Sequence, residues 1–285
     1  MASMRDIKRR RDSISSTQQI TKAMKLVSTV KLQRAKANAE RSKSYFSAMY
    51  ETIHSILKKS PDIQHKYLKA GENGRKAVVV ITSNRGLAGG YNSNVVKLIT
   101  KGELAKEDLA IYAIGKKGRD ALARSYDVVQ DYSDYIEEPV YAEAMKISEQ
   151  LLKDFEEGLI SEIYLAYTAF KNTVSHVPTM LKLLPVEIDI EDDNEDTQDN
   201  ALMNFEPAEE DALDLLIPKY ITSLIYGGMV EALASENGAR MQAMDSATSN
   251  AEEMIDDLTL LYNRARQGSI TQELTEIIAG ANAIS

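Results

Sequence analysis

The sequence predicts an α/β fold in which two very long terminal helices form an antiparallel coiled coil and a Rossmann-like α/β domain is inserted between them. Neither glycine nor proline occurs in residues 1–60, and the chain runs from Pro218 to Ser285 without another proline. Between these segments, short apolar runs alternate with helical patterns, as in a mostly parallel sheet covered by helices. These observations divide the chain into residues 1–60, 75–190, an acidic linker at 191–208, and 209–285.

The N-terminal segment, residues 1–60, is expected to hold one helix over its first ~57 residues, about 85 Å long at ~1.5 Å per residue. Helices in compact folds average about 11 to 12 residues, and a helix in water is only marginally stable without packing. A helix of this length therefore needs a partner along most of its surface. The nearest candidate is the C-terminal segment, residues 209–285, and pairing with it gives an antiparallel coiled coil.

The C-terminal segment shows the alternating three- and four-residue spacing of a coiled-coil seam, the row of side chains that faces the partner helix. The same spacing in the N-terminal segment selects weaker residues, so the seam is too poor for a strong stand-alone zipper. The C-terminal seam comprises Leu213, Leu216, Tyr220, Ser223, Gly227, Val230, Ala234, Asn237, Met241, Met244, Thr248, Ala251, Ile255, Leu258, Tyr262 and Ala265. The N-terminal seam comprises Ile7, Arg10, Ile14, Thr17, Thr21, Met24, Ser28, Lys31, Ala35, Asn38, Ser42, Tyr45 and Met49.

The spacing breaks after Ala265, because Ser269 and Gln272 fall where apolar residues are needed. A new apolar stripe begins there. It is either a frayed or docked end of the helix, or a face offered to another molecule. The stripe consists of Ile270, Leu274, Ile277, Ala281 and Ile284.

Charge is distributed unevenly along the chain. Residues 1–43 hold 12 Lys or Arg against 3 Asp or Glu, although the whole chain has a net charge of −9. Such a basic helix could be a solvated face, could bind nucleic acid phosphates, or could face acidic protein surfaces. Aromatic residues do not interleave with the basic ones before Tyr45 and Phe46. Nucleic acid is therefore the least favoured of the three.

The middle of the chain is expected to hold four strands, at 77–81, 109–114, 160–170 and 180–190. A helix over 141–157 precedes the third strand, and a turn at 172–178 separates the last two. Helical patterns also follow the first two strands after glycine-containing turns. This alternation predicts a mostly parallel sheet with helices on its faces.

Residues 83–92 follow the first strand, where a phosphate-binding loop would lie in a nucleotide-binding fold. They read Ser-Asn-Arg-Gly-Leu-Ala-Gly-Gly-Tyr-Asn, without the GxGxxG spacing or the GK[ST] ending of such loops. The second strand ends in Gly-Lys-Lys-Gly at 115–118 rather than in an acidic residue that could bind a ribose. Tight strand-to-helix turns are favoured, and a nucleotide-binding α/β enzyme with a helical oligomerisation arm is the alternative.

No catalytic constellation is evident. His54, His65 and His176 lack metal-ligand spacing, and the absence of cysteine excludes thiolate chemistry and disulfides. No apolar run approaches the ~20 residues of a membrane span, and the start has no apolar signal segment. Neither an enzyme, a cofactor nor a metal site is predicted.

Several motifs resemble the gamma-subunit family of the F-type ATP synthases. Residues 270–283, Ile-Thr-Gln-Glu-Leu-Thr-Glu-Ile-Ile-Ala-Gly-Ala-Asn-Ala, are similar to the C-terminal signature of that family, and 234–244 and 261–267 continue the match upstream. Residues 20–27 and 166–179 match further motifs, so the resemblance covers essentially the whole chain. Asn84 and Ala88 depart from it, because the family's glycine loop usually has an acid and a cysteine there.

The resemblance implies a non-catalytic subunit, the central rotor stalk that couples proton flow through the membrane c ring to ATP synthesis or hydrolysis at the alpha/beta catalytic hexamer. The coiled coil would stand inside the hexamer of alpha and beta subunits, and the α/β domain would join the epsilon subunit and the c-subunit ring. With no membrane span of its own, the chain would be a peripheral protein at the cytoplasmic face of the bacterial plasma membrane. Nucleic acid would not be a partner.

The resemblance also implies roles for individual residues. Phe205, Glu206 and Pro207 match a Tyr-Glu-Pro segment that faces the c ring in relatives. The apolar stripe from Ile270 to Ile284 would turn in a bearing formed by the alpha and beta subunits. The expected contacts with beta subunits are Met24, Arg85, Gly86, Ala88, Arg266, Gln267, Thr271 and Glu273.

Overall fold

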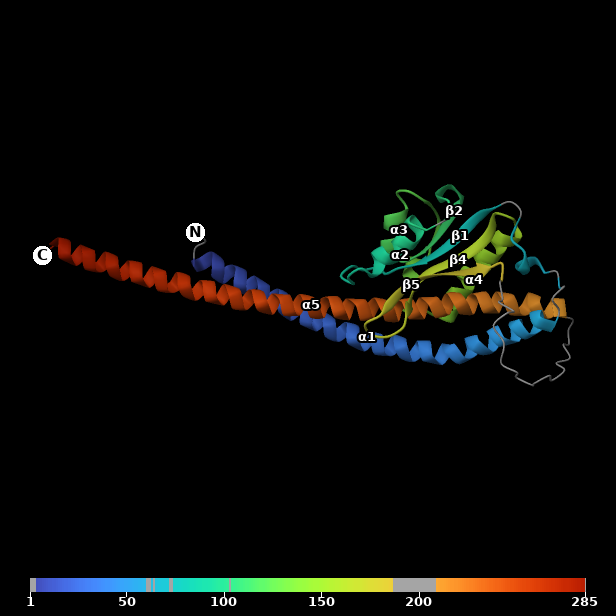
Figure 1. The fold of residues 1–285 in the computed structure, drawn as a ribbon, viewed down its shortest axis with the longest axis horizontal. Helices are drawn as coiled ribbons and strands as arrows, with labels where there is room; N and C mark the ends of the chain where they lie inside the picture. The colour runs from blue at the N-terminus through green and yellow to red at the C-terminus, as the bar shows by residue number, and fades with distance from the viewer. Residues whose placement is uncertain are drawn as a thin grey trace. The chain divides into compact units, whose positions relative to one another are not determined.

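The computed structural model describes residues 4–59, 63, 65–71, 74–102, 104–186 and 209–284. They fall into two compact units, one formed by Met1–Thr29 with Arg240–Ser285 and the other by Val30–Ala239. Helix α1 covers Met4–Lys59 and helix α5 covers Glu209–Ile284 (Figure 1). The expected fold class, two long terminal helices with an α/β domain between them, is confirmed.

A five-stranded sheet forms the centre of the second unit, in the order β3-β2-β1-β4-β5. Strand β1 (Arg75–Ile81) pairs in parallel with β2 (Leu109–Ile114) and β4 (Ile160–Phe170). Strand β3 (Asp127–Asp131) extends the parallel part, and β5 (His176–Leu184) pairs antiparallel with β4. Chain order therefore reverses between β1 and β4, the arrangement of a doubly wound sheet.

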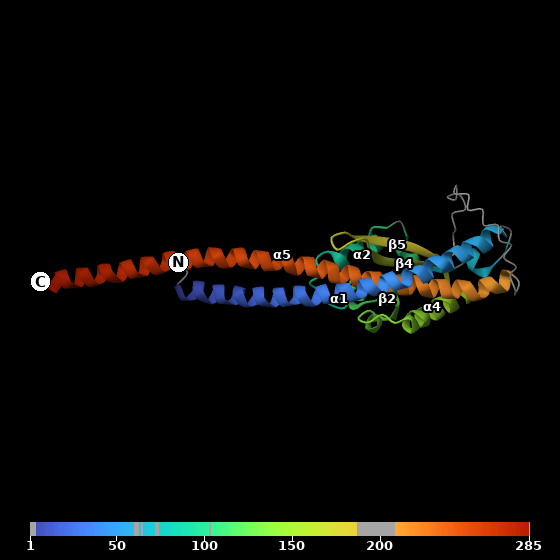
Figure 2. The same ribbon diagram turned by 90° about the horizontal axis from the view of Figure 1, so that it is seen from below.

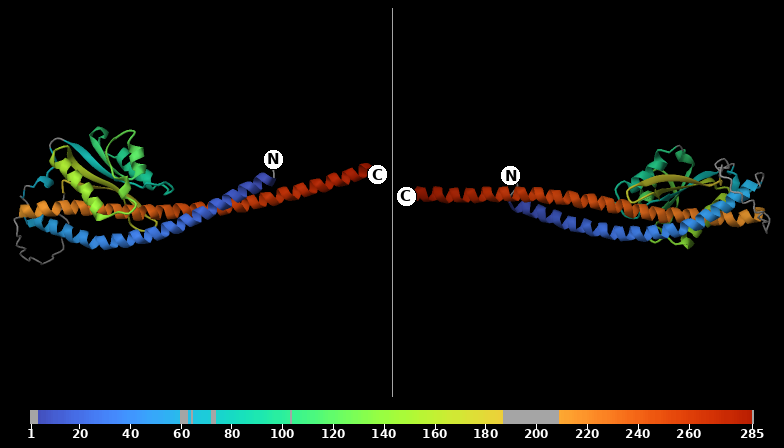
Figure 3. Two further views of the ribbon diagram at one scale, coloured as in Figure 1. Left: turned by 180° about the vertical axis from the view of Figure 1, so that it is seen from behind. Right: turned by 60° about the horizontal axis from the view of Figure 1, so that its bottom comes forward.

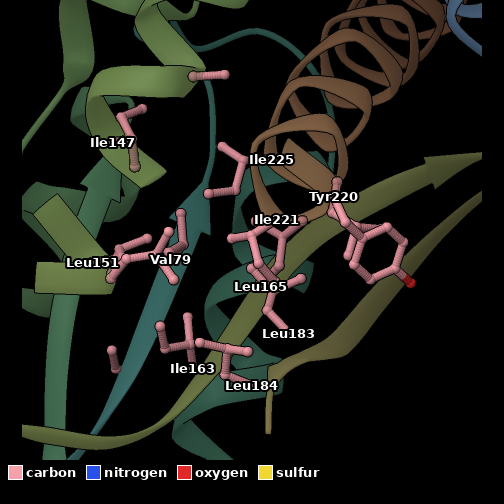
Figure 4. Packing of buried hydrophobic residues seen from close by; sticks show 14 of the residues in the cluster. Val79, Ile147, Leu151, Ile163, Leu165, Leu183, Leu184, Tyr220, Ile221 and Ile225 are labelled. Carbon is pink, nitrogen blue, oxygen red and sulfur yellow. The ribbon is translucent and has the colours of Figure 1, made fainter. Parts of the chain in front are cut away.

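The two faces of the sheet carry different helices because successive side chains of a strand point to opposite sides. Val78 and Val80 of β1 pack with α2 (Tyr91–Thr100) and α3 (Lys116–Leu122). Val79 and Ile81 face the other side, where α4 (Tyr141–Glu156) and α5 cover the sheet. Figure 4 shows Ile221 and Ile225 of α5 meeting Leu165 and Leu183, with Ile147 and Leu151 of α4 beside Val79.

A short segment before the sheet ties α4 to the start of α5. Tyr67, in the 3₁₀ turn Lys66–Leu68, donates a hydrogen bond of 2.6 Å from its hydroxyl to Glu156 of α4. Lys66 lies 2.9 Å from Glu156 and 3.2 Å from Asp214 of α5. Burial and this hydrogen bond raise the pKa of Tyr67 to about 12, so its hydroxyl stays protonated and remains a donor at neutral pH.

Two expectations for the sheet were wrong. The last strand begins at His176 rather than at 180, and the expected turn at 172–178 overlaps it; residues 187–190 lie outside the described part. Pro178 pairs with Thr168 inside the strand, which is possible because β5 is an edge strand and one face of its backbone needs no partner. Strand β3 was not expected, since it is short and mostly exposed.

Candidate functional site

In the unit that contains both chain ends, α1 and α5 run antiparallel and in contact (Figure 2). The Arg11 guanidinium lies 5.7 Å from the centre of the Tyr262 ring. The hydroxyls of Thr21 and Thr248 are 2.8 Å apart, and Lys25 Nζ is 2.5 Å from Asp245 Oδ1. Residue numbers fall along α5 as they rise along α1, so the pairing is antiparallel as expected.

The seam positions expected on α5 are all at least half-buried, whereas the α1 side is partly wrong. None of the α5 seam residues from Leu213 to Ala265 is exposed, and Met244 and Leu258 are buried. On α1 the buried row starts with a step of four residues instead of the expected three. Leu32 therefore lies in the buried row, at 5% exposure, and Lys31 is exposed. The same shift leaves Arg10, Thr17 and Asn38 exposed, in favour of Arg11, Gln18 and Ala39. The side chains at 41–47 lie outside the described set.

Met24 is half-buried on α1, between Thr21 and Lys25. Because these neighbours contact Thr248 and Asp245, Met24 lies opposite the middle of α5. It does not pack near the last turns of α5. The physical reason is length: Arg11, close to the start of α1, already reaches only Tyr262.

The last turns of α5 continue past the N-terminal end of α1 (Figure 3), and their side chains are exposed. Apolar members of the stripe remain uncovered: Ile270 is 49% exposed, Leu274 55% and Ile277 68%. Ala281 is also exposed, and Ile284 ends the helix. The four residues expected to meet beta subunits in this region are exposed as well; they are Arg266, Gln267, Thr271 and Glu273.

Further apolar side chains are exposed on this unit that the sequence analysis did not select. Ile20, Leu26 and Val27 of α1 are each more than half exposed. On α5, Met254 and Leu260 are exposed in the same way. The adjacent pair Leu26-Val27 was a usable signal, because both residues lie outside the seam expected on α1. An apolar surface of this kind marks a site of contact with another molecule.

The glycine loop between β1 and α2 is closed by its own side chains. Asn92 Oδ1 accepts from the backbone N–H of Ser83 at 2.9 Å, and the Ser83 hydroxyl donates to the carbonyl of Arg85 at 2.6 Å. Leu87 has a φ of 62° and projects into solvent, 65% exposed. Ala88 next to it is buried to 2%. Arg85 is exposed and Gly86 lies on the surface beside it.

Amide groups that could hold a phosphate at these turns already have partners. The backbone N–H of Lys116 donates to Asn84 Oδ1 at 3.0 Å, and that of Gly118 donates to Thr82 Oγ1 at 2.8 Å. The Ser83 amide is occupied as well, by Asn92 Oδ1. A phosphate would have to displace them, so the loop geometry favours a structural turn over a nucleotide site.

An acidic side chain anchors the neighbouring loop after β3. Asp131 Oδ1 accepts from the N–H of Ser133 at 3.0 Å, and its other oxygen lies 2.7 Å from Arg119. Burial opposes ionisation of Asp131, but the hydrogen bonds from Ser133 and Arg119 outweigh it and lower the pKa of this carboxyl. The Ser133 carbonyl in turn accepts from Asn84 at 2.9 Å. Asn84, a departure from the family pattern, thus joins the two loops.

The three residues expected to face a c ring, Phe205, Glu206 and Pro207, lie outside the described residues, as does the acidic linker at 191–208. Among the described residues, no cluster of His, Cys, Asp or Glu has the geometry to hold a metal ion. None of the helices searched, which are those of the described ranges, is long and apolar enough to cross a membrane.

Comparison with known proteins covers the full chain. A family model described as ATP synthase matches residues 3–284. The ATP synthase gamma chain of Lachnoclostridium phytofermentans is 62% identical over 291 residues, covering all of both chains. That of Alkaliphilus metalliredigens is 44% identical, with 99% of this chain and 98% of the relative covered. A gamma chain described as sodium ion specific, from Acetobacterium woodii, is 40% identical over 99% of both.

Solved structures share the fold. The rotor of the Euglena gracilis mitochondrial ATP synthase aligns with a TM-score of 0.63 at 18% identity, covering 94% of this chain and 98% of the other. A central stalk and c-ring structure from Tetrahymena thermophila aligns with a TM-score of 0.60 at 24% identity, covering 80% and 99%. With full-length relatives at 40 to 62% identity, the chain belongs to the ATP synthase gamma chain family.

Proposed function

We propose that this chain is the central rotor stalk of a bacterial F-type ATP synthase, where it couples proton flow through a membrane c ring to ATP synthesis or hydrolysis at an alpha/beta hexamer. It carries no catalysis itself. The shaft would contact each beta subunit differently at each angle, and these differences in contact free energy would drive the catalytic sites through different nucleotide affinities.

The observation that carries the proposal is the uncovered surface of the paired helices. Ile270, Leu274 and Ile277 are 49 to 68% exposed at the end of α5, and Ile20 and Val27 are exposed on α1. A monomer in water would not keep so much apolar surface on two long helices. A surrounding sleeve of alpha and beta subunits would cover it, and nonspecific apolar contacts would still allow rotation.

Exposure supports the proposed beta-subunit contacts. Arg266, Gln267, Thr271 and Glu273 are free to meet the sleeve, and so are Arg85 and the exposed Leu87 of the glycine loop. Ala88 is buried, so in this proposal it positions the loop instead of touching a partner. Met24 would act at the level of Thr248. Screened charges along the basic α1 would face acidic loops of beta.

The α/β domain would bind the epsilon subunit and the c ring, the latter through Phe205, Glu206 and Pro207. The protein would then be a peripheral protein at the cytoplasmic face of the plasma membrane. The proposal is testable because the chain has no cysteine, so one introduced thiol is unique.

The experiment attaches a bead to Ser125→Cys, an exposed position of the α/β domain, in a complex whose alpha/beta hexamer is fixed to a surface. ATP should turn the bead in one direction. Omitting this chain while the hexamer is retained serves as control. A bead that stays still in an assembled complex that hydrolyses ATP would refute the rotor function.

A further inference from the structure

One face of α5 contacts the carboxyl ends of β1 and β4 over about three turns. The hydroxyl of Tyr91, the first residue of α2, donates to the carbonyl of Ala232 at 3.1 Å. The Ser235 hydroxyl, fully buried, donates to the carbonyl of Thr168 in β4 at 3.0 Å. This face, called the crossover contact below, consists of Gly228, Glu231, Ala232, Ser235 and Gly238.

The remaining members of the crossover contact fit closely. A Cβ on Gly228 would lie 2.9 Å from Cδ2 of Leu165, and a Cβ on Gly238 would lie 2.7 Å from Cε1 of His176. Glu231 accepts from the N–H of Phe170 at 3.4 Å. Helical spacing explains the set, since residues three and four apart share one face.

This contact lies where a doubly wound fold usually binds a ligand. Chain order reverses between β1 and β4, and ligands of such folds occupy the crevice beyond the strand ends at that point. Here α5 bonds to the segment after β1 and to the end of β4 from positions three residues apart. The helix takes the place that a nucleotide would have, and the crevice holds a piece of the chain's own shaft.

We propose that the crossover contact is the point at which torque passes between the α/β domain and α5. This inference rests on the rotor function proposed above. In that function the c ring and epsilon act on the α/β domain, while only the long helices enter the hexamer, so torque has to cross from the sheet into α5.

The geometry suits this role better than the apolar packing along the rest of the helix. Ile221 and Ile225 contact the sheet through side chains alone, and apolar contacts are non-directional. The Tyr91 and Ser235 bonds each join a side chain to a backbone carbonyl, and hydrogen bonds weaken steeply when misaligned. They are separated by about 4.5 Å along the helix axis, at 1.5 Å per residue. Rolling or sliding α5 against the sheet breaks both.

The test compares two double variants in the whole membrane-bound complex. Tyr91→Phe with Ser235→Ala removes both hydroxyls of the crossover contact. Tyr164→Phe with Ser223→Ala makes the same chemical changes, but the Tyr164 hydroxyl bonds to Glu162 within β4 and Ser223 bonds to Lys219 within α5. The control therefore keeps the bonds that Tyr91, Glu231 and Ser235 make across the crossover contact.

Two measurements are made on each complex. Losing two hydrogen bonds should speed hydrogen exchange of amides 228–238 about 30-fold relative to the control. ATP-driven proton pumping into vesicles should fall per ATP hydrolysed, with hydrolysis itself kept at the control rate. If the double variant does not assemble, Ser235→Ala is compared with Ser223→Ala.

Pumping per ATP equal to that of the control, with faster exchange at 228–238, would overturn the role of the crossover contact. Unchanged exchange at those amides would overturn it too. Failure of the wild-type and control complexes to pump at all would instead overturn the rotor function, so the two failures are distinguishable.

Discussion

Thr21 and Thr248 join the two long helices through their hydroxyls, 2.8 Å apart. One hydroxyl donates across the helices, and the other donates within its own helix, where the carbonyl of Gln18 lies 3.0 Å from Thr21 and that of Met244 lies 2.7 Å from Thr248. Thr21 is buried to 8% exposure in the row of α1 that faces α5. A polar pair at one level of such a row favours a single axial alignment over its neighbours.

The threonine pair should show measurable coupling. Replacing either Thr21 or Thr248 by valine should cost about 1 kcal/mol, the usual worth of one hydrogen bond. The double variant should cost less than the two single ones together, because it leaves no hydroxyl without its cross-helix partner. Hydrogen exchange of amides 240–265 in the four proteins gives the coupling free energy. Strict additivity would show that the pair does not contribute to alignment.

Two adjacent glycines of α5 should respond oppositely to alanine. Gly227 borders a cleft of about 1440 Å³, and no atom lies within 4 Å of its missing Cβ. Gly227→Ala should therefore stabilise the helix by up to about 1 kcal/mol. Gly228→Ala places a methyl 2.9 Å from Leu165 and should cost about 1–3 kcal/mol relative to Gly227→Ala. The thermal unfolding midpoints of the two variants measure this difference in stability, and equal midpoints would contradict the packing around Gly228.

Stability should depend on pH through His176. Burial lowers the pKa of this histidine below its ordinary value of 6.5, and both ring nitrogens are buried without a hydrogen-bond partner among the described residues. As pH falls below about 6.5, the unfolded chain binds a proton that the folded chain does not bind until its lower pKa is reached. Stability is therefore complete above that pH and declines through the window below it.

Urea unfolding between pH 8 and pH 5 measures this effect. His176→Phe should flatten the curve, while His54→Gln, which changes a histidine stacked on Tyr50, should leave the slope in place. Carboxyls with lowered pKa, such as Asp131, act below about pH 4 and do not interfere. A slope that survives in His176→Phe would assign the pH dependence to another group.

Truncating α5 before Ile277 should weaken assembly more than turnover. The described side chains of the deleted turns are exposed, and these turns lie beyond the N-terminal end of α1 (Figure 3). They would add apolar area to the sleeve contact without any specific bond. The complex should assemble in lower yield and melt at lower temperature, and surviving complexes should hydrolyse ATP at a near-normal rate. Complete loss of hydrolysis in intact complexes would mean that these turns signal to the catalytic sites.

Sequence periodicity was sufficient to predict the long helices and three of the strands, because each of these elements has a strong local pattern. Strands β2 and β4 were expected at their observed bounds. Tertiary context decided the rest. Pro178 suggested a turn but lies in an edge strand. Leu32 is buried in place of Lys31, because the α1 residues that face α5 are determined by the side chains of α5. The level of Met24 depends on how the helices align, which neither helix encodes alone.

The crossover contact was beyond sequence reasoning for a related reason. Tyr91 and Ser235 are common residues far apart in the chain, and nothing in either segment identifies the other as its partner. The glycine loop did suggest a ligand site, and its position in the fold was correctly identified. What fills that position became visible only when α5 was seen against β1 and β4.

The contacts between α1 and α5 also impose an order on synthesis. Thr21 and Lys25 emerge from the ribosome long before Thr248 and Asp245 exist, and pairings this distant in sequence form late. Until α5 has been synthesised, α1 lacks its partner helix. A strongly apolar row would invite aggregation during that wait, whereas threonine, serine and alanine beside a dense positive charge keep the nascent segment dispersed. The modest apolar character of the α1 row that faces α5 thus limits aggregation before the chain can fold.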